Sequence, residues 1–377
     1  MSAATRRENG FSLVEVLVGM AIGVLVLVVI MQTFAVAEGY KRTTTSGTDA
    51  QINGLSALRT LESEVRMAGY GLMNGANLCP TINRYYGGVS TSLNNLPVTI
   101  TDGGSGADSI EVTYSSADTG AAPARIVRGM PTPSNVTKVS TLGNLNTCDF
   151  VVFASKDGSK ACSVLQVTGL EPNNIQFQTG SGQSNYNPSG GAQKAYFPAG
   201  GYSTDDVIIN LGKQIDKRFS VRRTSTSDEY FFHMTNANAA PDGCSTPDPT
   251  PELDMVSNIV YLKAQYGVAA AGSQQVTCWT SAAAGDAGCG IGAGSNWSAP
   301  APADVQRIKA IRVAVVARSA LSEKPTTGST CNTTTAAPIS WIGGPTIDLS
   351  AVPNWMCYRY KVYQTEIPMI NVIWANT

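Results

Sequence analysis

The chain has 377 residues, of which 43% are hydrophobic and 14% are charged. This composition excludes a disordered or fibrous chain, and the length suffices for a sizeable core. Lysine and arginine total 26 against 27 acidic residues, which gives a formal net charge of -1. A chain with this charge has no strong overall electrostatic attraction to nucleic acid or to anionic lipid.

The N-terminus predicts a membrane-spanning helix. Residues 1–10 are polar and contain Arg6 and Arg7, whereas residues 11–37 are almost wholly apolar. The 22 residues between Glu15 and Glu38 carry no charge. As a helix they span about 33 Å, which matches a hydrocarbon core of roughly 30 Å. The arginines before this segment predict a cytoplasmic N-terminus and a chain that lies mostly outside.

One carboxylate interrupts this segment. Glu15 lies in its first turns, where an ionised group costs at least a few kcal/mol unless it is paired. We expect the helix itself to supply no partner. Glu15 therefore predicts an interaction with another chain.

The residues around this carboxylate resemble a known processing site. The run Gly10-Phe11-Ser12-Leu13-Val14-Glu15 is similar to the N-terminal motif of type IV pilins and pseudopilins. The resemblance implies that a prepilin peptidase cuts after Gly10 and that the new amine of Phe11 is methylated. It also implies that Glu15 pairs with the terminus of a neighbouring subunit during assembly. The alternatives are a plain single-span anchor and a secretory signal peptide cleaved after Ala37.

Residues 38–73 predict a linker followed by an amphipathic helix. Residues 38–50 are polar and weakly helical, so we expect a melted or kinked stretch there. A capping box at residues 48–51 then starts a helix that ends at Gly69 and Gly71. Its apolar stripe recurs every three or four residues: Ile52, Leu55, Leu58, Leu61, Val65, Ala68 and Leu72. We favour core packing of this stripe over a separate groove for a partner.

Residues 74–377 predict a β-rich head. Short apolar runs separated by turn residues predict strands at 109–114, 150–154, 163–168, 206–211, 230–235, 256–266, 307–318 and 358–374. The run 256–266 could instead hold a short helix. The run at 307–318 is typical of a central strand covered by the helix, and Pro368 places the last strand at an edge or a bulge. Long loops are expected at 179–201, 236–251, 269–303 and 323–346.

The last third of the chain extends the resemblance. Residues 252–268, 308–319 and 363–374 are similar to segments of the PilW family of minor pilins. The chain departs from the usual pattern at Ile370, where an arginine is common, and in its insertions at 269–303 and 323–346. These departures concern surface specificity.

Tests for chemistry find no catalytic signature. The common phosphate-binding, hydrolase and thiol motifs are missing, so we expect no enzyme, no cofactor and no metal. The single histidine, His233, is interpreted as a satisfied strand residue. Asp205, Asp206 and the acids at 248–254 lack calcium-loop spacing. One basic cluster could bind DNA, although a solvated strand face is the favoured interpretation: Lys213, Lys217, Arg218, Arg222 and Arg223.

Eight cysteines follow the predicted membrane segment and suggest disulfides in an oxidising compartment. They are Cys79, Cys148, Cys162, Cys244, Cys278, Cys289, Cys331 and Cys357. The sequence does not fix their connectivity, because eight cysteines allow 105 pairings. Short spacing favours 148 with 162, 278 with 289 and 331 with 357, which leaves 79 with 244.

Together these observations predict an α+β protein, in which a long N-terminal helix, half transmembrane and half amphipathic, packs on an antiparallel β-sheet head with long loops held by disulfides. The expected parts are a leader at 1–10, an assembly helix at 11–37, a linker and amphipathic helix at 38–73, and a head at 74–377. The resemblance implies a minor pilin that helps to prime type IV pilus assembly and forms part of the tip complex. An alternative is a pseudopilin of a type II secretion system. Alternatives of other classes are a secreted binding protein or adhesin released after Ala37 and a membrane-anchored periplasmic enzyme.

The same resemblance implies the partners and the location. The partners are the prepilin peptidase, other minor pilins, the major pilin and the inner-membrane assembly platform, with a tip adhesin as a further candidate. No small-molecule substrate is expected, and nucleic acid is disfavoured. The chain is expected in the inner membrane with a periplasmic head, and at the pilus tip after assembly, where adhesion and twitching motility are the associated activities.

Overall fold

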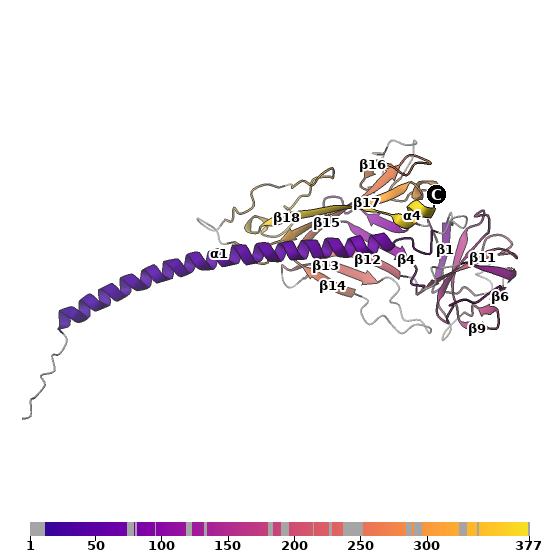
Figure 1. Ribbon diagram of the computed structural model, residues 1–377, viewed down its shortest axis with the longest axis horizontal. Coiled ribbons are helices and arrows are strands. Elements are labelled where there is room, and N and C mark those ends of the chain that lie inside the picture. Colours follow the sequence, from indigo (N-terminus) through magenta and orange to yellow (C-terminus); the bar gives the residue numbers. More distant parts are fainter. Residues whose placement is uncertain are drawn as a thin grey trace, which may run out of the picture.

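The computed structural model describes residues 12–73, 79, 81–94, 96–117, 123–131, 134–179, 184–189, 196–213, 215–225, 228–236, 252–283, 289, 296–323, 330–337 and 339–375. One long helix extends from a β-rich head (Figure 1). The predicted α+β class is therefore confirmed.

The helix α1 (Leu13–Met67) is continuous over 55 residues. The interruption expected at residues 38–50 is therefore wrong. Within this stretch the hydroxyl of Thr44 donates to the carbonyl of Tyr40 at 2.9 Å, and that of Thr48 to the carbonyl of Thr44 at 3.0 Å. These bonds satisfy polar side chains inside a helix, which local propensity alone does not reveal. Thr48 thus lies within α1 and does not start a second helix.

Two antiparallel sheets form the part of the head that contacts α1 (Figure 1). In the four-stranded sheet the order is β16 (Val276–Thr280), β15 (Ile259–Ala269), β17 (Ile308–Arg318) and β18 (Tyr360–Pro368). In the five-stranded sheet it is β14 (Glu252–Ser257), β13 (Tyr230–Asn236), β12 (Ile215–Arg223), β4 (Ser109–Tyr114) and β3 (Val98–Thr101).

A nine-stranded sheet forms a distal lobe at the end of the head that lies away from the protruding part of α1 (Figure 1). Its order is β2 (Val89–Asn94), β1 (Thr81–Tyr86), β8 (Cys162–Gln166), β7 (Phe150–Ala154), β11 (Val207–Gly212), β5 (Ala124–Arg128), β6 (Val136–Val139), β10 (Asn174–Gln176) and β9 (Gly169–Glu171). Neighbouring strands are antiparallel except β1 and β8, which are parallel. Buried aromatic and aliphatic side chains give this lobe its own cores.

Short helices complete the chain: α3 (Pro302–Val305), the 3-10 helix η2 (Trp355–Cys357) and α4 (Ile370–Ala375). The strand expected to reach residue 374 ends at Pro368, and the chain turns into α4. The run expected at 256–266 is divided between β14 and β15 by Asn258, which has a φ of 61°. The alternative of a short helix there is wrong.

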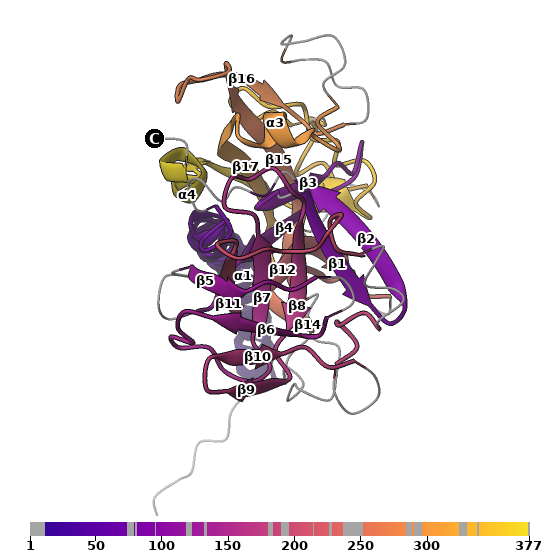
Figure 2. The ribbon, with the colours of Figure 1, turned by 90° about the vertical axis from the view of Figure 1, so that its right-hand side faces the viewer.

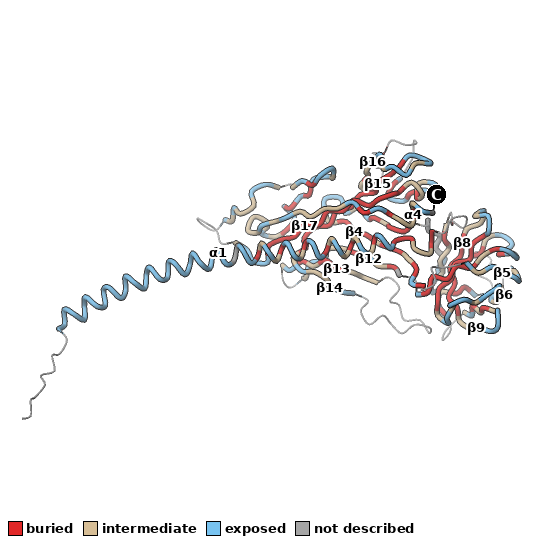
Figure 3. Tube along the Cα trace, viewed as in Figure 1, coloured by how far each residue is buried: buried red, intermediate tan, exposed pale blue. Residues whose placement is uncertain are grey.

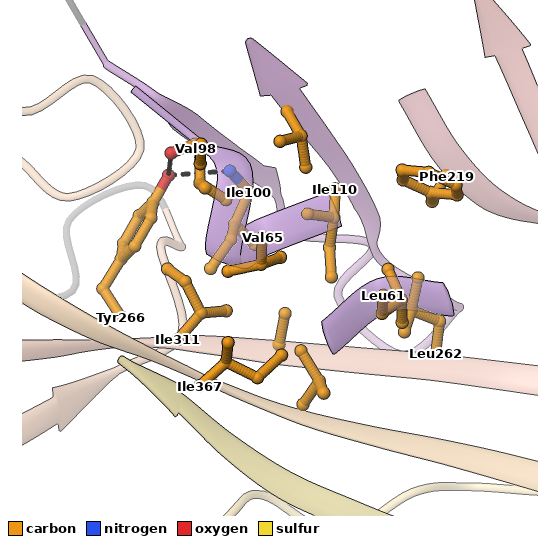
Figure 4. Close-up of a cluster of buried hydrophobic side chains, with 14 of the residues drawn as sticks. Leu61, Val65, Val98, Ile100, Ile110, Phe219, Leu262, Tyr266, Ile311 and Ile367 are labelled. Atoms are coloured by element: carbon orange, nitrogen blue, oxygen red, sulfur yellow. Dashed lines mark hydrogen bonds between the residues drawn. The ribbon is translucent and has the colours of Figure 1, made fainter. Parts of the chain in front are cut away.

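The main core joins α1 to both of the sheets that it contacts (Figure 4). Leu61 and Val65 of α1 lie with Ile311 of β17, so the expected packing of the helix on this strand is confirmed. Tyr266 links the two sheets, because its hydroxyl accepts from the backbone N–H of Ile100 at 2.7 Å. β17 is buried along its whole length, and β18 is an edge strand, as Pro368 predicted.

Candidate assembly helix

The first part of α1 extends beyond the described part of the head. Every described residue from Leu13 to Lys41 is exposed, and we call this part the protruding half (Figure 3). Among the described residues, α1 is the helix long and apolar enough to cross a membrane. Its apolar side chains face every direction, so no single stripe is reserved for the head.

The N-terminal end of α1 is closed by a capping box. Ser12 is the N-cap, and its hydroxyl accepts from the N–H of Val14 at 3.4 Å. The carboxylate of Glu15 accepts from the N–H of Ser12 at 2.9 Å. The expectation that the helix supplies no partner for Glu15 is therefore wrong, because a glutamate three residues after the N-cap can reach back to it. Gly10 and Phe11 lie outside the described residues.

The second part of α1, residues 46–67, packs on the head, and we call it the packed half. Its buried side begins with small residues: Ser46, Ala50, Gly54 and Ala57. A Cβ atom on Gly54 would overlap the ring of Tyr363 in β18, so glycine allows the helix and the strand to approach closely.

The expected apolar stripe is only partly buried. The buried members of the stripe are Leu61, Val65, Ala68 and Leu72. In contrast, the side chains of Ile52 and Leu55 are 61% and 52% exposed. Small residues replace them on the buried side because the helix lies too close to the sheet for larger ones. A search for small residues every three or four positions could have found this side.

Polar contacts hold the packed half in place. Glu64 accepts from the ammonium of Lys217 at 2.7 Å and from the hydroxyl of Tyr114 at 2.8 Å. At the end of α1 the side-chain amide of Asn371 in α4 donates to the carbonyl of Ala68 at 2.9 Å. Sequence reasoning missed these residues, since the partners are 50 or more positions apart in the chain.

The basic cluster at residues 213–223, most of which lies on β12 (Ile215–Arg223), is largely neutralised. Four of its members form ion pairs: Lys217 with Glu64, Arg218 with Glu111, Arg222 with Asp254 and Arg223 with Asp228. Lys213 is exposed and has no ion pair in the described part of the chain. Paired charges present little net field to a phosphate backbone, which supports the solvated-strand interpretation.

His233 is a hydrogen-bonded strand residue, as the sequence analysis favoured. Its Nδ1 lies 2.9 Å from an oxygen of Asp254, and its Nε2 lies 3.3 Å from the hydroxyl of Thr235. The hydrogen bond from Arg222 is the main cause that lowers the pKa of Asp254. Both ring nitrogens of His233 thus have partners within the sheet.

The acidic residues considered for calcium do not gather into a ligand set. Asp205 pairs with Arg125 at 3.3 Å, and Asp206 pairs with Lys160 at 3.3 Å. Within the described residues no group of three or more histidine, cysteine, aspartate or glutamate side chains could hold a metal ion. Asp248 lies outside those residues.

Three disulfides are described: Cys79 with Cys162, Cys278 with Cys289, and Cys331 with Cys357. The last two were expected from short spacing. The pairings of 148 with 162 and of 79 with 244 are wrong, because Cys162 in β8 lies beside β1 and near residue 79. Cys148 is also disulfide-bonded, and Cys244 lies outside the described residues. The pairing of β1 with β8 brings Cys79 and Cys162 together, and the spacing of cysteines in the sequence does not reveal this pairing.

Comparisons with known proteins agree with this arrangement. Residues 5–31 match the family model described as the prokaryotic N-terminal methylation motif, and residues 219–371 match the model described as type IV pilus-assembly protein W. The chain therefore resembles prepilin-like proteins at its N-terminus and PilW proteins in its C-terminal region. The searches of curated proteins and of solved structures found no match.

The two matches fit the structure. The methylation motif covers the start of the protruding half, and the PilW region begins in β12 and ends at Asn371, the residue that caps α1. The two matches point to a structural component of a pilus, and they support interaction with other pilus components and with the prepilin processing machinery in general. The apolar helix fits a membrane-anchored pilin. The distal lobe lies outside both matched regions.

Proposed function

We propose that this PilW-type chain is a minor pilin that helps to prime type IV pilus assembly and forms part of the tip complex, without catalytic activity. The observation that carries the proposal is the protruding half, whose apolar residues have no partner within the described chain. Apolar surface of this extent needs lipid or other helices around it. The family model that matches residues 219–371 is described as a type IV pilus-assembly protein. This description favours a role in a pilus over a role in a secretion system.

In this proposal the same helix serves two environments in turn. The leader at residues 1–10 is removed after Gly10, and Phe11 becomes the methylated N-terminus. The protruding half then spans the inner membrane with the head in the periplasm. On assembly it leaves the lipid and packs beside the helices of other minor pilins and of the major pilin, at the assembly platform, while the head selects neighbours.

Glu15 connects the two environments. One of its oxygens accepts the N–H of Ser12, and this bond survives cleavage after Gly10, since both residues remain in the mature chain. The other oxygen has no partner among the described residues. We propose that it receives the terminal amine of a neighbouring subunit, so that one carboxylate caps its own helix and holds the next. A charge pair of this kind is strong only where water is excluded, as between packed helices.

The mass of the native protein tests the processing step. We expect a mature chain that begins at a methylated Phe11. A chain that begins at Glu38 would show signal-peptide cleavage and overturn the proposal.

Two substitutions of Glu15 separate its cap from its charge. Glu15→Gln keeps an oxygen for Ser12 but removes the charge, whereas Glu15→Ala removes both. We expect both variants to insert into the membrane and both to lose cross-links to neighbouring pilins. Asp49→Asn, on the same helix, is the matched control and should keep them. Normal cross-linking and normal piliation with Glu15→Gln would show that the charge has no role in assembly.

A further inference from the structure

A cavity of about 390 Å³ lies where the four-stranded sheet ends, beside α3 (Figure 2 shows α3 with β15, β16 and β17). It is bounded by the loop at 270–274, which follows β15, and by residues 303–309, which lead into β17. Its polar lining includes Asp304, Gln306 and Arg307, and alanines form much of the remainder. This volume lies within the range of small-molecule sites.

Lys309 is the unusual member of this lining. It is only 4% exposed, and its ammonium makes no hydrogen bond or ion pair within the described part of the chain. Lys309 precedes Ala310 at a bulge, where the pairing of β17 with β15 shifts register. Burial lowers the pKa of this lysine. The nitrogen of Lys309 is not among the solvent-inaccessible atoms that lack a partner, so it is open to the cavity, where an anionic ligand would compensate its charge.

Arg307 adds a second group that lacks a partner. Its Nη1 pairs with Asp304 at 2.7 Å, and its Nε donates to the carbonyl of Ala269 at 3.1 Å. These bonds and the ring of Trp297, 5.7 Å away, hold the guanidinium in position. Its Nη2 is buried and has no hydrogen bond. The cavity therefore contains two cations and one anion, and one positive charge remains uncompensated.

We propose that this cavity binds a small organic monocarboxylate, either as a free acid or as an acidic sugar residue. One carboxylate would neutralise the remaining charge and would accept a hydrogen bond from the ammonium of Lys309. A phosphate dianion would place excess negative charge beside Asp304. The alanines leave room for the non-polar part of the ligand. The positive charge and the hydrogen-bond donors of the cavity suit the binding of an anion. We expect no reaction of the ligand there.

The experiment measures binding to the detergent-solubilised full chain by calorimetry at constant ionic strength. Galacturonate and lactate are the two carboxylate probes, and galactose and inorganic phosphate are the controls. We expect galacturonate, lactate or both to bind, and galactose to show no binding. A response to galacturonate alone identifies the acidic sugar as the source, whereas equal responses identify the carboxylate alone as the feature recognised.

Two variants locate the site. Lys309→Met should weaken carboxylate binding by at least about tenfold, because a charge-assisted hydrogen bond is lost. Lys138→Met, on an exposed position of β6, should leave binding unchanged. Equal binding of galacturonate and galactose by the unmodified chain, no binding of either carboxylate, or tighter binding of phosphate would each overturn the proposal, whether or not Lys309→Met folds. So would unchanged binding in a folded Lys309→Met.

Discussion

The two halves of α1 differ in a way that apolar content alone does not explain. The protruding half is the more apolar, yet all its described residues are exposed. The packed half contains serine, threonine, glutamate and arginine, yet one of its sides is buried along its length. The comparison shows that burial within this chain follows the arrangement of side chains around the helix and not their number.

The physical reason lies in the two kinds of surface. An amphipathic helix presents one apolar side, which the chain's own sheets can cover. A helix that is apolar all round needs an environment on every side, which only lipid or several other helices can provide. The head therefore covers the less apolar half, and the more apolar half remains for partners from outside the chain.

Truncation of a leucine should give the largest difference in stability between the two halves of α1. Leu61→Ala in the packed half removes a fully buried side chain, so we expect a loss of about 2–5 kcal/mol in the free energy of unfolding of the head. Leu25→Ala, at a position that is 66% exposed, is the matched control and should leave that value unchanged. Thermal denaturation of the detergent-solubilised chain measures both. Similar losses in the two variants would mean that the protruding half also packs on the head.

Addition of one methyl group should have an intermediate effect. Gly54→Ala would overlap the ring of Tyr363, and such overpacking costs about 1–3 kcal/mol. Gly23→Ala meets no atom within 4 Å and should not change the melting temperature of the head. A Gly54→Ala chain that melts above the unmodified one would show that helix propensity, worth about 1 kcal/mol, outweighs the close approach.

The smallest effect on the free energy of unfolding should come from removal of Lys217, which joins β12 to the packed half through its ion pair with Glu64. Burial by itself would lower the pKa of Lys217, but the hydrogen bond and charge of Glu64 raise it overall. Because the pKa is raised in the folded chain, the pair stabilises the fold below the ordinary lysine pKa and loses this contribution as the pH rises through the folded value. We expect Lys217→Met to remove about 1 kcal/mol at pH 8.

The pH dependence separates this pair from general alkaline denaturation. Melting curves between pH 8 and pH 12 should show a smaller difference between Lys217→Met and the unmodified chain at the alkaline end. Lys213→Met, on an exposed residue, should follow the unmodified chain throughout. If the difference for Lys217→Met stayed constant over this range, the ion pair would not be its cause.

The sequence predicted the regular parts of this fold well. Strong apolar runs placed the strands at 109–114 and 150–154 with the bounds that the structure has, and the run at 307–318 matched the buried β17 to one residue. Apolar runs bounded by turns act locally, so they can be identified in a single sequence. Weaker alternation left much of the distal lobe unpredicted, because such strands are stabilised by their neighbours.

What the sequence alone determined, therefore, is the α+β class, the long apolar helix and the prepilin-like N-terminus, and short spacing correctly favoured two of the disulfides. Each depends on residues that lie close together in the chain. Only the tertiary structure decided that α1 runs without a break, that Gly54 allows the approach of β18, that Cys162 pairs with Cys79, and that Lys309 is buried without a counter-ion. These features depend on which strands become neighbours, and long-range packing determines that.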